Sequence, residues 1–191
     1  SSIAIPDERL ERQYYLDMYK FGCVARGNTP PISLQAIWTA DNGNLPPWKG
    51  DFHHDLNTQL SYWPGYTSNH LDLTAGFTNW LLKVRKQNER WTRQYFELPG
   101  LNVPGVTTIS GKEMGGWIQY SMSPTTAAWL AQHFYWQWKY DKGNAAFLKQ
   151  SFHYIDQVTL FTVGYILKEM YQPFSTLSSS PEYFDNSRKA W

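Results

Sequence analysis

The sequence predicts an all-α fold of paired helices, arranged as an α/α toroid with a site built from loops at one end. Apolar residues recur with helical periodicity wherever their spacing is clear. No segment has the pattern of a convincing β-hairpin. The connections between the expected helices alternate between short and long, and long irregular loops are uncommon in compact domains unless they carry function. A simple helical bundle is the alternative architecture.

The first two helices are expected within the first 64 residues. The first begins at Pro6 and Asp7 and stops at Gly22, a residue type that is common just beyond a helix. The second covers about 56–62 and ends near Pro64, because proline disrupts the interior of a helix. The apolar face of the first helix consists of Leu10, Tyr14, Met18 and Phe21.

Two long helices are expected over 71–95 and 144–170. Each has an apolar stripe at helical spacing, which predicts one packed face per helix. The stripe of the first consists of Leu73, Phe77, Trp80, Leu81, Val84 and Trp91. The stripe of the second consists of Leu148, Phe152, Ile155, Thr159 and Ile166.

A shorter helix lies between these two and has two distinct faces. It is expected to begin at Ser123 and Pro124, a capping residue and a proline suited to the first turn, and to end before Asp141. Such a helix is expected to pack against an outer layer of helices on one side and to line the water-filled interior of the toroid on the other. Burial on both sides is the alternative. The apolar face consists of Ala127, Leu130, Ala131, Phe134 and Trp138. The second face is aromatic and able to form hydrogen bonds, and consists of Trp129, His133, Trp136 and Tyr140.

Composition and charge exclude several classes of partner. The length of 191 residues suits a single domain, and 17 Lys and Arg balance 16 Asp and Glu. Nucleic acids and acidic membranes need a basic surface, so neither is an expected partner. No apolar run approaches the roughly 18 residues that cross a bilayer, so membrane insertion is not expected. The single Cys23 cannot form an internal disulfide.

Aromatic residues are unusually frequent. They make up 17% of the chain, including 10 Trp and 13 Tyr. Trp and Tyr present flat apolar faces and a hydrogen-bonding edge, which suits the C–H faces and hydroxyl groups of a sugar. A Trp-rich core is the alternative explanation. The long connections at 24–55, 96–122 and 171–191 also contain Trp, together with Gly, Pro and Ser.

Five segments, in order along almost the whole chain, resemble the α-L-fucosidases of glycoside hydrolase family 95. The family pattern reads approximately P-A-N-L-Q-G-I-W, P-P-W, H-x-N-x-N-x-Q-M-N-Y-W-P, A-W-L-x-x-H and S-P-E. The corresponding segments here are PISLQAIW at 31–38, PPW at 46–48, DFHHDLNTQLSYWP at 51–64, AWLAQH at 128–133 and SPE at 180–182. The resemblance is more specific for the superfamily than for the substrate.

The resemblance implies an (α/α)6 barrel and hydrolysis with inversion at the anomeric carbon. An inverting glycosidase needs a carboxylic acid for the leaving oxygen and a base for the water, with the two carboxyls roughly 6.5–9.5 Å apart. By its motif, Glu182 would be the general acid. Its apolar and aromatic sequence neighbours would favour the protonated form.

The most important departure from the family pattern is at Asp55. In the family, two Asn residues hold the attacking water and a later Asp is the base. Asn57 matches the second Asn, but Asp55 replaces the first. An ionised Asp only accepts hydrogen bonds, whereas Asn also donates. We expect Asp55 to act as a base or to share the water with a base supplied elsewhere; a divergent branch with another sugar or no activity is the rival hypothesis.

Four further residues are expected to contact the substrate. His53 matches the histidine of the H-x-N-x-N motif, Trp63 lies in the same block, and Trp129 and His133 are plausible walls of the sugar pocket. Adjacent histidines point in different directions and match no zinc spacing, so no metal site is expected. No cofactor is expected either. The partner is an oligosaccharide or polysaccharide.

The family's base lies in a motif downstream of S-P-E that does not occur here. We therefore expect residues 1–191 to be part of a single catalytic domain, truncated on the C-terminal side and forming a partial ring. Such a part is not expected to turn over substrate alone. Two other functions stay open: a glycosidase or polysaccharide lyase of other specificity, and a sugar-binding protein without catalysis. By analogy with the family, a periplasmic or secreted location is expected.

Overall fold

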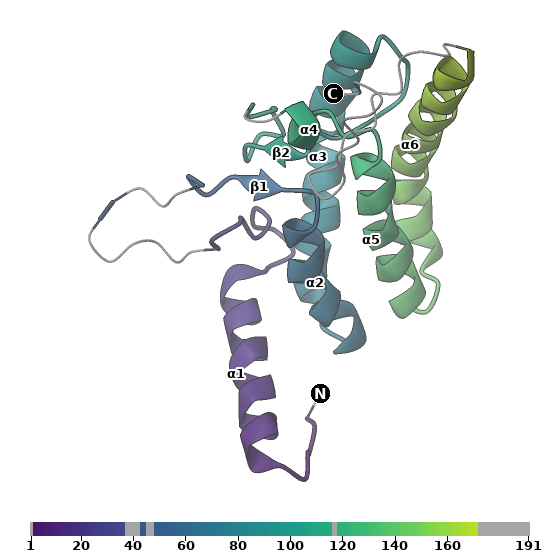
Figure 1. Cartoon of the computed structure of the whole chain (residues 1–191). Helices are drawn as coiled ribbons and strands as arrows, with labels where there is room; N and C mark the ends of the chain where they lie inside the picture. The colour runs from purple at the N-terminus through teal and green to yellow at the C-terminus, as the bar shows by residue number, and fades with distance from the viewer. Residues whose placement is uncertain (1, 37–42, 45–47, 116–117, 172–191) are drawn as a thin grey trace.

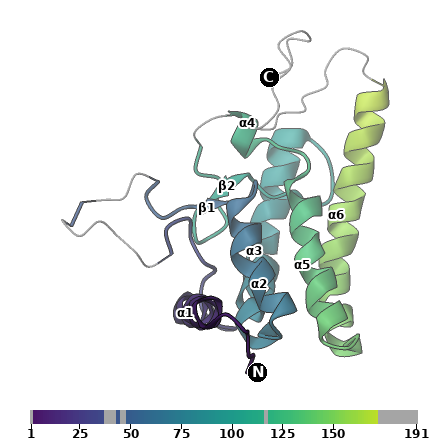
Figure 2. The same cartoon turned by 60° about the horizontal axis from the view of Figure 1, so that its bottom comes forward.

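The computed structural model describes residues 2–36, 43–44, 48–115 and 118–171, and the all-α prediction is confirmed for them. Figures 1 and 2 show the chain from two directions. None of the described helices is long and apolar enough to cross a membrane. The helices are α1 (Glu8–Val24), α2 (Asn57–Thr67), α3 (Leu71–Phe96), α4 (Ile118–Ser121), α5 (Thr126–Tyr140) and α6 (Ala145–Tyr171), and the strands are β1 (Phe52–His53) and β2 (Val106–Thr107).

Two helix pairs form the body of the molecule. Short connections join α2 to α3 and α5 to α6, whereas long segments join α1 to α2 and α3 to α5, as the sequence predicted. In both views α5 lies between α2 and α6, and α3 also contacts α2, α5 and α6. The strands and α4 gather at the end of the helices where α2 and α5 begin (Figure 1). The loop-built site that the sequence predicts would lie at this end.

The core between the pairs is largely aromatic. Tyr62 of α2 stacks on Phe77 of α3 with ring centroids 4.9 Å apart. Phe134 of α5 contacts Tyr154 of α6 with centroids 4.7 Å apart. All four side chains are buried. Part of the high aromatic content therefore belongs to packing.

Two predicted helix ends are wrong. Helix α1 continues past Gly22 to Val24, and α2 continues through Pro64 to Thr67. Pro64 lacks the N–H that would bond to the carbonyl of Leu60, but both residues are on the exposed side of α2, where water can bond to that carbonyl. Gly65 permits close packing, because a Cβ there would lie 2.4 Å from Thr74 Cγ2. The packing of Gly65 against α3 thus stabilises the part of α2 that follows Pro64.

The start of α5 also differs from the prediction. It begins at Thr126, and neither Ser123 nor Pro124 is in the helix. The buried Asn102 supplies the cap: its Oδ1 accepts from the backbone N–H of Ala127 at 3.1 Å, and its Nδ2 donates to the carbonyl of Ser123 at 2.9 Å. A residue distant in sequence therefore satisfies an N–H that a local side chain was expected to satisfy.

Helix α6 has the predicted extent but buries a different face. The predicted stripe is largely exposed, and only Ile155 of its five residues is partly buried. The packed face is displaced around the helix and consists of Phe147, Ser151, Tyr154, Val158, Phe161 and Tyr165. Both faces are rich in apolar residues, so periodicity did not distinguish them.

The segment 106–114 forms a small hairpin that was not predicted. Thr107 bridges Glu113, and the Thr108 N–H donates to the Lys112 carbonyl at 2.9 Å. The turn contains Gly111 at a φ of 74°, which glycine adopts without strain. The dipeptide Ser110-Gly111 was the available sequence signal.

Candidate active site

The segment 51–55 alternates between the core and an outer face. In the antiparallel pair of β1 and β2, Phe52 faces Thr107 and His53 faces Val106. Phe52 and His54 are buried against Trp80, with ring centroids 5.4 and 5.6 Å from it. Because side chains alternate along an extended strand, Asp51 and His53 lie on the opposite face from Phe52, and Asp55, which is in the turn at 54–56, is partly buried.

His54 is a structural residue. Its Nε2 lies 2.9 Å from Thr107 Oγ1, and its backbone N–H donates to the Gly105 carbonyl at 2.7 Å. Burial lowers the pKa of His54 to about 3, because the charged imidazolium is disfavoured away from water. His54 is therefore neutral at ordinary pH and fixes β1 to β2.

His53 lies between a carboxylate and an indole. Its Nε2 is 3.0 Å from Asp51 Oδ1, with side-chain exposures of 15% and 11%. The contact is not an aligned hydrogen bond, and neither atom has a hydrogen-bond partner among the described residues. The ring of Trp48 meets the His53 ring edge-on, with centroids 5.8 Å apart. Trp48 itself is 52% exposed, so its ring is available to a ligand.

Backbone contacts bring separate sequence segments to this place. The Leu34 N–H donates to the Asp51 carbonyl at 2.9 Å, and the Gly50 N–H donates to Gln35 Oε1 at 3.2 Å. The Asp51 N–H donates to the Trp48 carbonyl at 3.2 Å. The described parts of 31–38 and 46–48 are thus joined to 51–55. Ile37, Trp38, Pro46 and Pro47 lie outside the described residues.

Asp55 and Asn57 lie where the extended segment enters α2. Asp55 Oδ1 is buried and has no hydrogen-bond partner in the described part of the chain. Asn57 is the first residue of α2 and is exposed. Thr58 and Gln59 of the same turn donate to the carbonyls of His53 and His54 at 2.7 Å each. The first turn of α2 therefore fixes the backbone that carries the candidate residues.

The other predicted sugar contacts lie along α2 and α5. Trp63 is on the exposed side of α2 and meets Trp136 edge-on, with ring centroids 5.6 Å apart, and Trp129 is partly buried. His133 is fully buried, with Nδ1 2.9 Å from the Tyr66 hydroxyl, and burial lowers its pKa to about 3. A sugar-contacting role for these three residues stays a prediction.

Glu182, the expected general acid, lies outside the described residues. In the part of the chain that the structure describes, no group of three His, Cys, Asp or Glu side chains could hold a metal ion.

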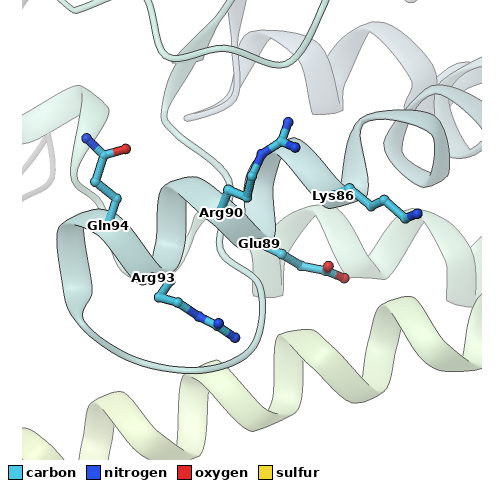
Figure 3. A pocket seen from close by; sticks show the side chains of 5 residues that line it. All are labelled: Lys86, Glu89, Arg90, Arg93 and Gln94. Carbon is cyan, nitrogen blue, oxygen red and sulfur yellow. The ribbon is translucent and has the colours of Figure 1, made fainter.

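A separate groove of about 540 Å³ follows the C-terminal half of α3. Figure 3 shows its side chains, with Arg90 and Arg93 pointing to opposite sides of the helix. It has no aromatic surface for stacking on a sugar and none of the residues expected from the sequence. Its lining is Lys86, Glu89, Arg90, Arg93 and Gln94.

Sequence reasoning missed Asp51 and Trp48 as candidate site residues. Both lie within the segments that match the family pattern, but that pattern indicates no role for them. The signal for Asp51 was the alternation of polar 51, 53 and 55 with Phe52 between them. Trp48 had no comparable signal, because its place beside His53 depends on the turn at 48–51.

Comparison with known proteins identifies the family to which this sequence is similar. The chain matches the model of the glycosyl hydrolase family 95 catalytic domain over residues 5–190. It is 23% identical over 171 residues to the probable alpha-fucosidase A of Aspergillus niger. The aligned residues cover 85% of the chain and 21% of that protein. It is 23% identical over 146 residues to the alpha-L-fucosidase 2 of Arabidopsis thaliana, covering 75% and 17% respectively. The chain thus spans about a fifth of the length of these relatives.

Proposed function

The chain belongs to glycosyl hydrolase family 95, and we propose that the complete protein hydrolyses α-L-fucosides or closely related glycosides with inversion at the anomeric carbon. The observation that carries this proposal is the family match over 5–190. The names of both relatives, an alpha-fucosidase and an alpha-L-fucosidase, support the choice of sugar. The exposed Trp48 beside His53 supports a carbohydrate ligand, because an indole face suits the apolar face of a pyranose.

In the proposed reaction, Asp55 takes a proton from a water molecule while the water oxygen attacks the anomeric carbon. The bond from that carbon to the leaving oxygen breaks, and Glu182 gives its proton to the leaving oxygen. Asn57 holds the water through its side-chain amide. The buried Asp55 Oδ1, with no hydrogen-bond partner among the described residues, is an acceptor that a water molecule would satisfy.

The first test uses the complete protein and a panel of nitrophenyl glycosides, with the anomeric configuration of the first product followed by NMR. We expect turnover of the α-L-fucoside and release of the β-anomer. Retention of configuration would exclude the inverting mechanism. Unsaturated products absorbing in the ultraviolet would indicate a lyase, and saturable glycan binding without turnover would indicate a binding protein.

Substitutions then test the roles of the two carboxylates. Glu182→Gln and Asp55→Asn are each expected to lower kcat by about 10²–10⁴-fold, the usual contribution of a general acid or base. The loss in Glu182→Gln is expected to be smaller with nitrophenyl fucoside than with a fucosyl oligosaccharide, because nitrophenolate needs little protonation. Glu8→Gln on the exposed start of α1 is the matched control. Unchanged or higher turnover in Asp55→Asn would remove Asp55 from the role of base.

A periplasmic or secreted location is part of the same proposal, because polymeric glycans are encountered outside the cytoplasm. Fractionation of the native host with an antibody against the complete protein tests it. Recovery in the cytoplasmic fraction alone would contradict it.

A further inference from the structure

The backbone of Asp51 is held by hydrogen bonds to two other segments. Its carbonyl accepts from the Leu34 N–H, and its own N–H donates to the Trp48 carbonyl. The neighbouring Gly50 is tied to the Gln35 side chain. The backbone that carries the Asp51 carboxylate is therefore fixed from two directions.

The backbone of His53 is fixed as well, and the two torsions of its side chain are then set by the contacts of the ring. The residue pairs with Val106 in the small sheet, and Thr58 bonds to its carbonyl. The ring then contacts Asp51 through Nε2 at 3.0 Å and the edge of Trp48. These two contacts restrict the ring.

The contact occupies one of the two nitrogens of the ring. A ligand hydroxyl that bonds to the His53 ring would therefore use the other nitrogen, Nδ1, because Nε2 is in contact with Asp51. Both Asp51 Oδ1 and His53 Nε2 are buried and have no aligned hydrogen-bond partner among the described residues, so the 3.0 Å contact between them is the polar interaction that separation would remove. The ring is costly to turn away from Asp51.

We propose that Asp51 is a positioning residue, which orients the His53 ring so that Nδ1 is presented to a hydroxyl group of the sugar. This inference rests on the proposed function, since it assigns the sugar as the ligand of His53. Asp51 itself does not touch the substrate. It acts through His53, and its effect disappears when His53 is absent.

The experiment is a double-mutant cycle in the complete protein, with Asp51→Asn, His53→Gln and the double variant. Asn has nearly the same shape as Asp but no charge. Binding of L-fucose is measured by calorimetry, and kcat and KM are measured with nitrophenyl α-L-fucoside. We expect Asp51→Asn to raise KM and Kd roughly tenfold, the scale of one hydrogen bond to a well-placed group, with a smaller change in kcat. The exposed Asp17→Asn on α1 is the charge-matched control and is expected to behave as wild type.

The cycle separates positioning from a structural effect. If Asp51 acts through His53, the double variant binds no more weakly than His53→Gln alone. If Asp51 only supports the fold, its loss adds in full to that of His53→Gln and lowers Tm in both backgrounds. Additive losses, or an Asp51→Asn variant with wild-type KM and Kd, would overturn the proposal.

A measurement without any sugar separates this inference from the proposed function. Ring ¹³C–¹H spectra of histidine-labelled complete protein, with His53→Gln to assign the signal, report the environment of His53. We expect the His53 signal to shift and broaden in Asp51→Asn, and an unchanged signal would contradict the orienting contact. If this shift is seen but no glycoside is bound or hydrolysed, the contact stands and the proposed function fails.

Discussion

Ala36 has a backbone conformation that favours glycine. Its φ of 52° lies in the left-handed region, where a Cβ meets the following carbonyl. The family pattern P-A-N-L-Q-G-I-W has glycine at this position. The adjoining Gln35 side chain accepts from the Gly50 N–H, so the strained residue lies next to a contact that supports Asp51.

We therefore expect Ala36→Gly to stabilise the protein by about 1 kcal/mol, because glycine relieves the left-handed strain. The increase is smaller than the full strain, since glycine also gains freedom in the unfolded chain. Urea unfolding of the complete protein measures it. Ala128→Gly, on the exposed side of α5, is the control and is expected to destabilise by about 0.5–1 kcal/mol. A loss of stability in Ala36→Gly would contradict the strain assigned to this residue.

Candidate site residues differ in how far the sequence could identify them. His53, Asp55 and Asn57 follow from a motif, and the structure brings their backbone together at the start of α2. Asp51 gains a role only because the turn at 48–51 directs its carboxylate to His53. That turn depends on Leu34 and Gln35, which bond to residues 17 and 15 positions later in the chain. Spacing alone does not contain this information.

Among the elements, α6 has the most unusual surface. One face packs on α5 and α3, and the other exposes a series of large apolar residues. A helix that is apolar on both faces is usually covered on both sides. The exposed residues are Leu148, Phe152, Leu160, Val163, Ile166, Leu167, Met170 and Tyr171.

We expect further helices of the toroid to cover this outer face in the complete protein. Ile166→Asp, at a position 51% exposed here, would then destabilise the complete protein by about 3 kcal/mol, since a buried unpaired charge is costly. Thermal unfolding measures the loss, and Lys149→Asp, on the exposed surface near the start of α6, is the control. If the face is open to water, Ile166→Asp will change stability by no more than about 0.5 kcal/mol. A second copy of the protein on this face would instead give a dimer that Ile166→Asp dissociates.

At the scale of the whole molecule, two buried histidines connect stability to pH. Burial lowers the pKa values of both His54 and His133 to about 3. In the unfolded chain each would titrate near 6.5. Between these values the unfolded state binds protons that the folded state does not, so stability falls as pH decreases from about 6.5 toward 3.

The expected slope is up to about 1.4 kcal/mol per pH unit for each histidine, and it vanishes above pH 6.5. His133→Gln removes one of the two groups and should reduce the loss of stability between pH 7 and pH 5. Urea unfolding at both pH values gives the comparison with wild type. Gln132→Ala on the exposed side of α5 is the control, and it should leave the slope unchanged because glutamine does not titrate. An equal slope in wild type and His133→Gln would show that folding does not lower the pKa of His133.

The sequence by itself determined the number and extent of the long helices, the alternation of short and long connections, and the family. These features depend on local periodicity and on short motifs, which can be read within one segment. Only the tertiary structure decided which face of α6 is buried, that Asn102 caps α5, and that α2 continues through Pro64. Each of these depends on a partner in another segment of the chain. A helix with two apolar faces buries the face against which the fold places another element. An N–H group at the start of a helix bonds to whichever acceptor the fold places beside it.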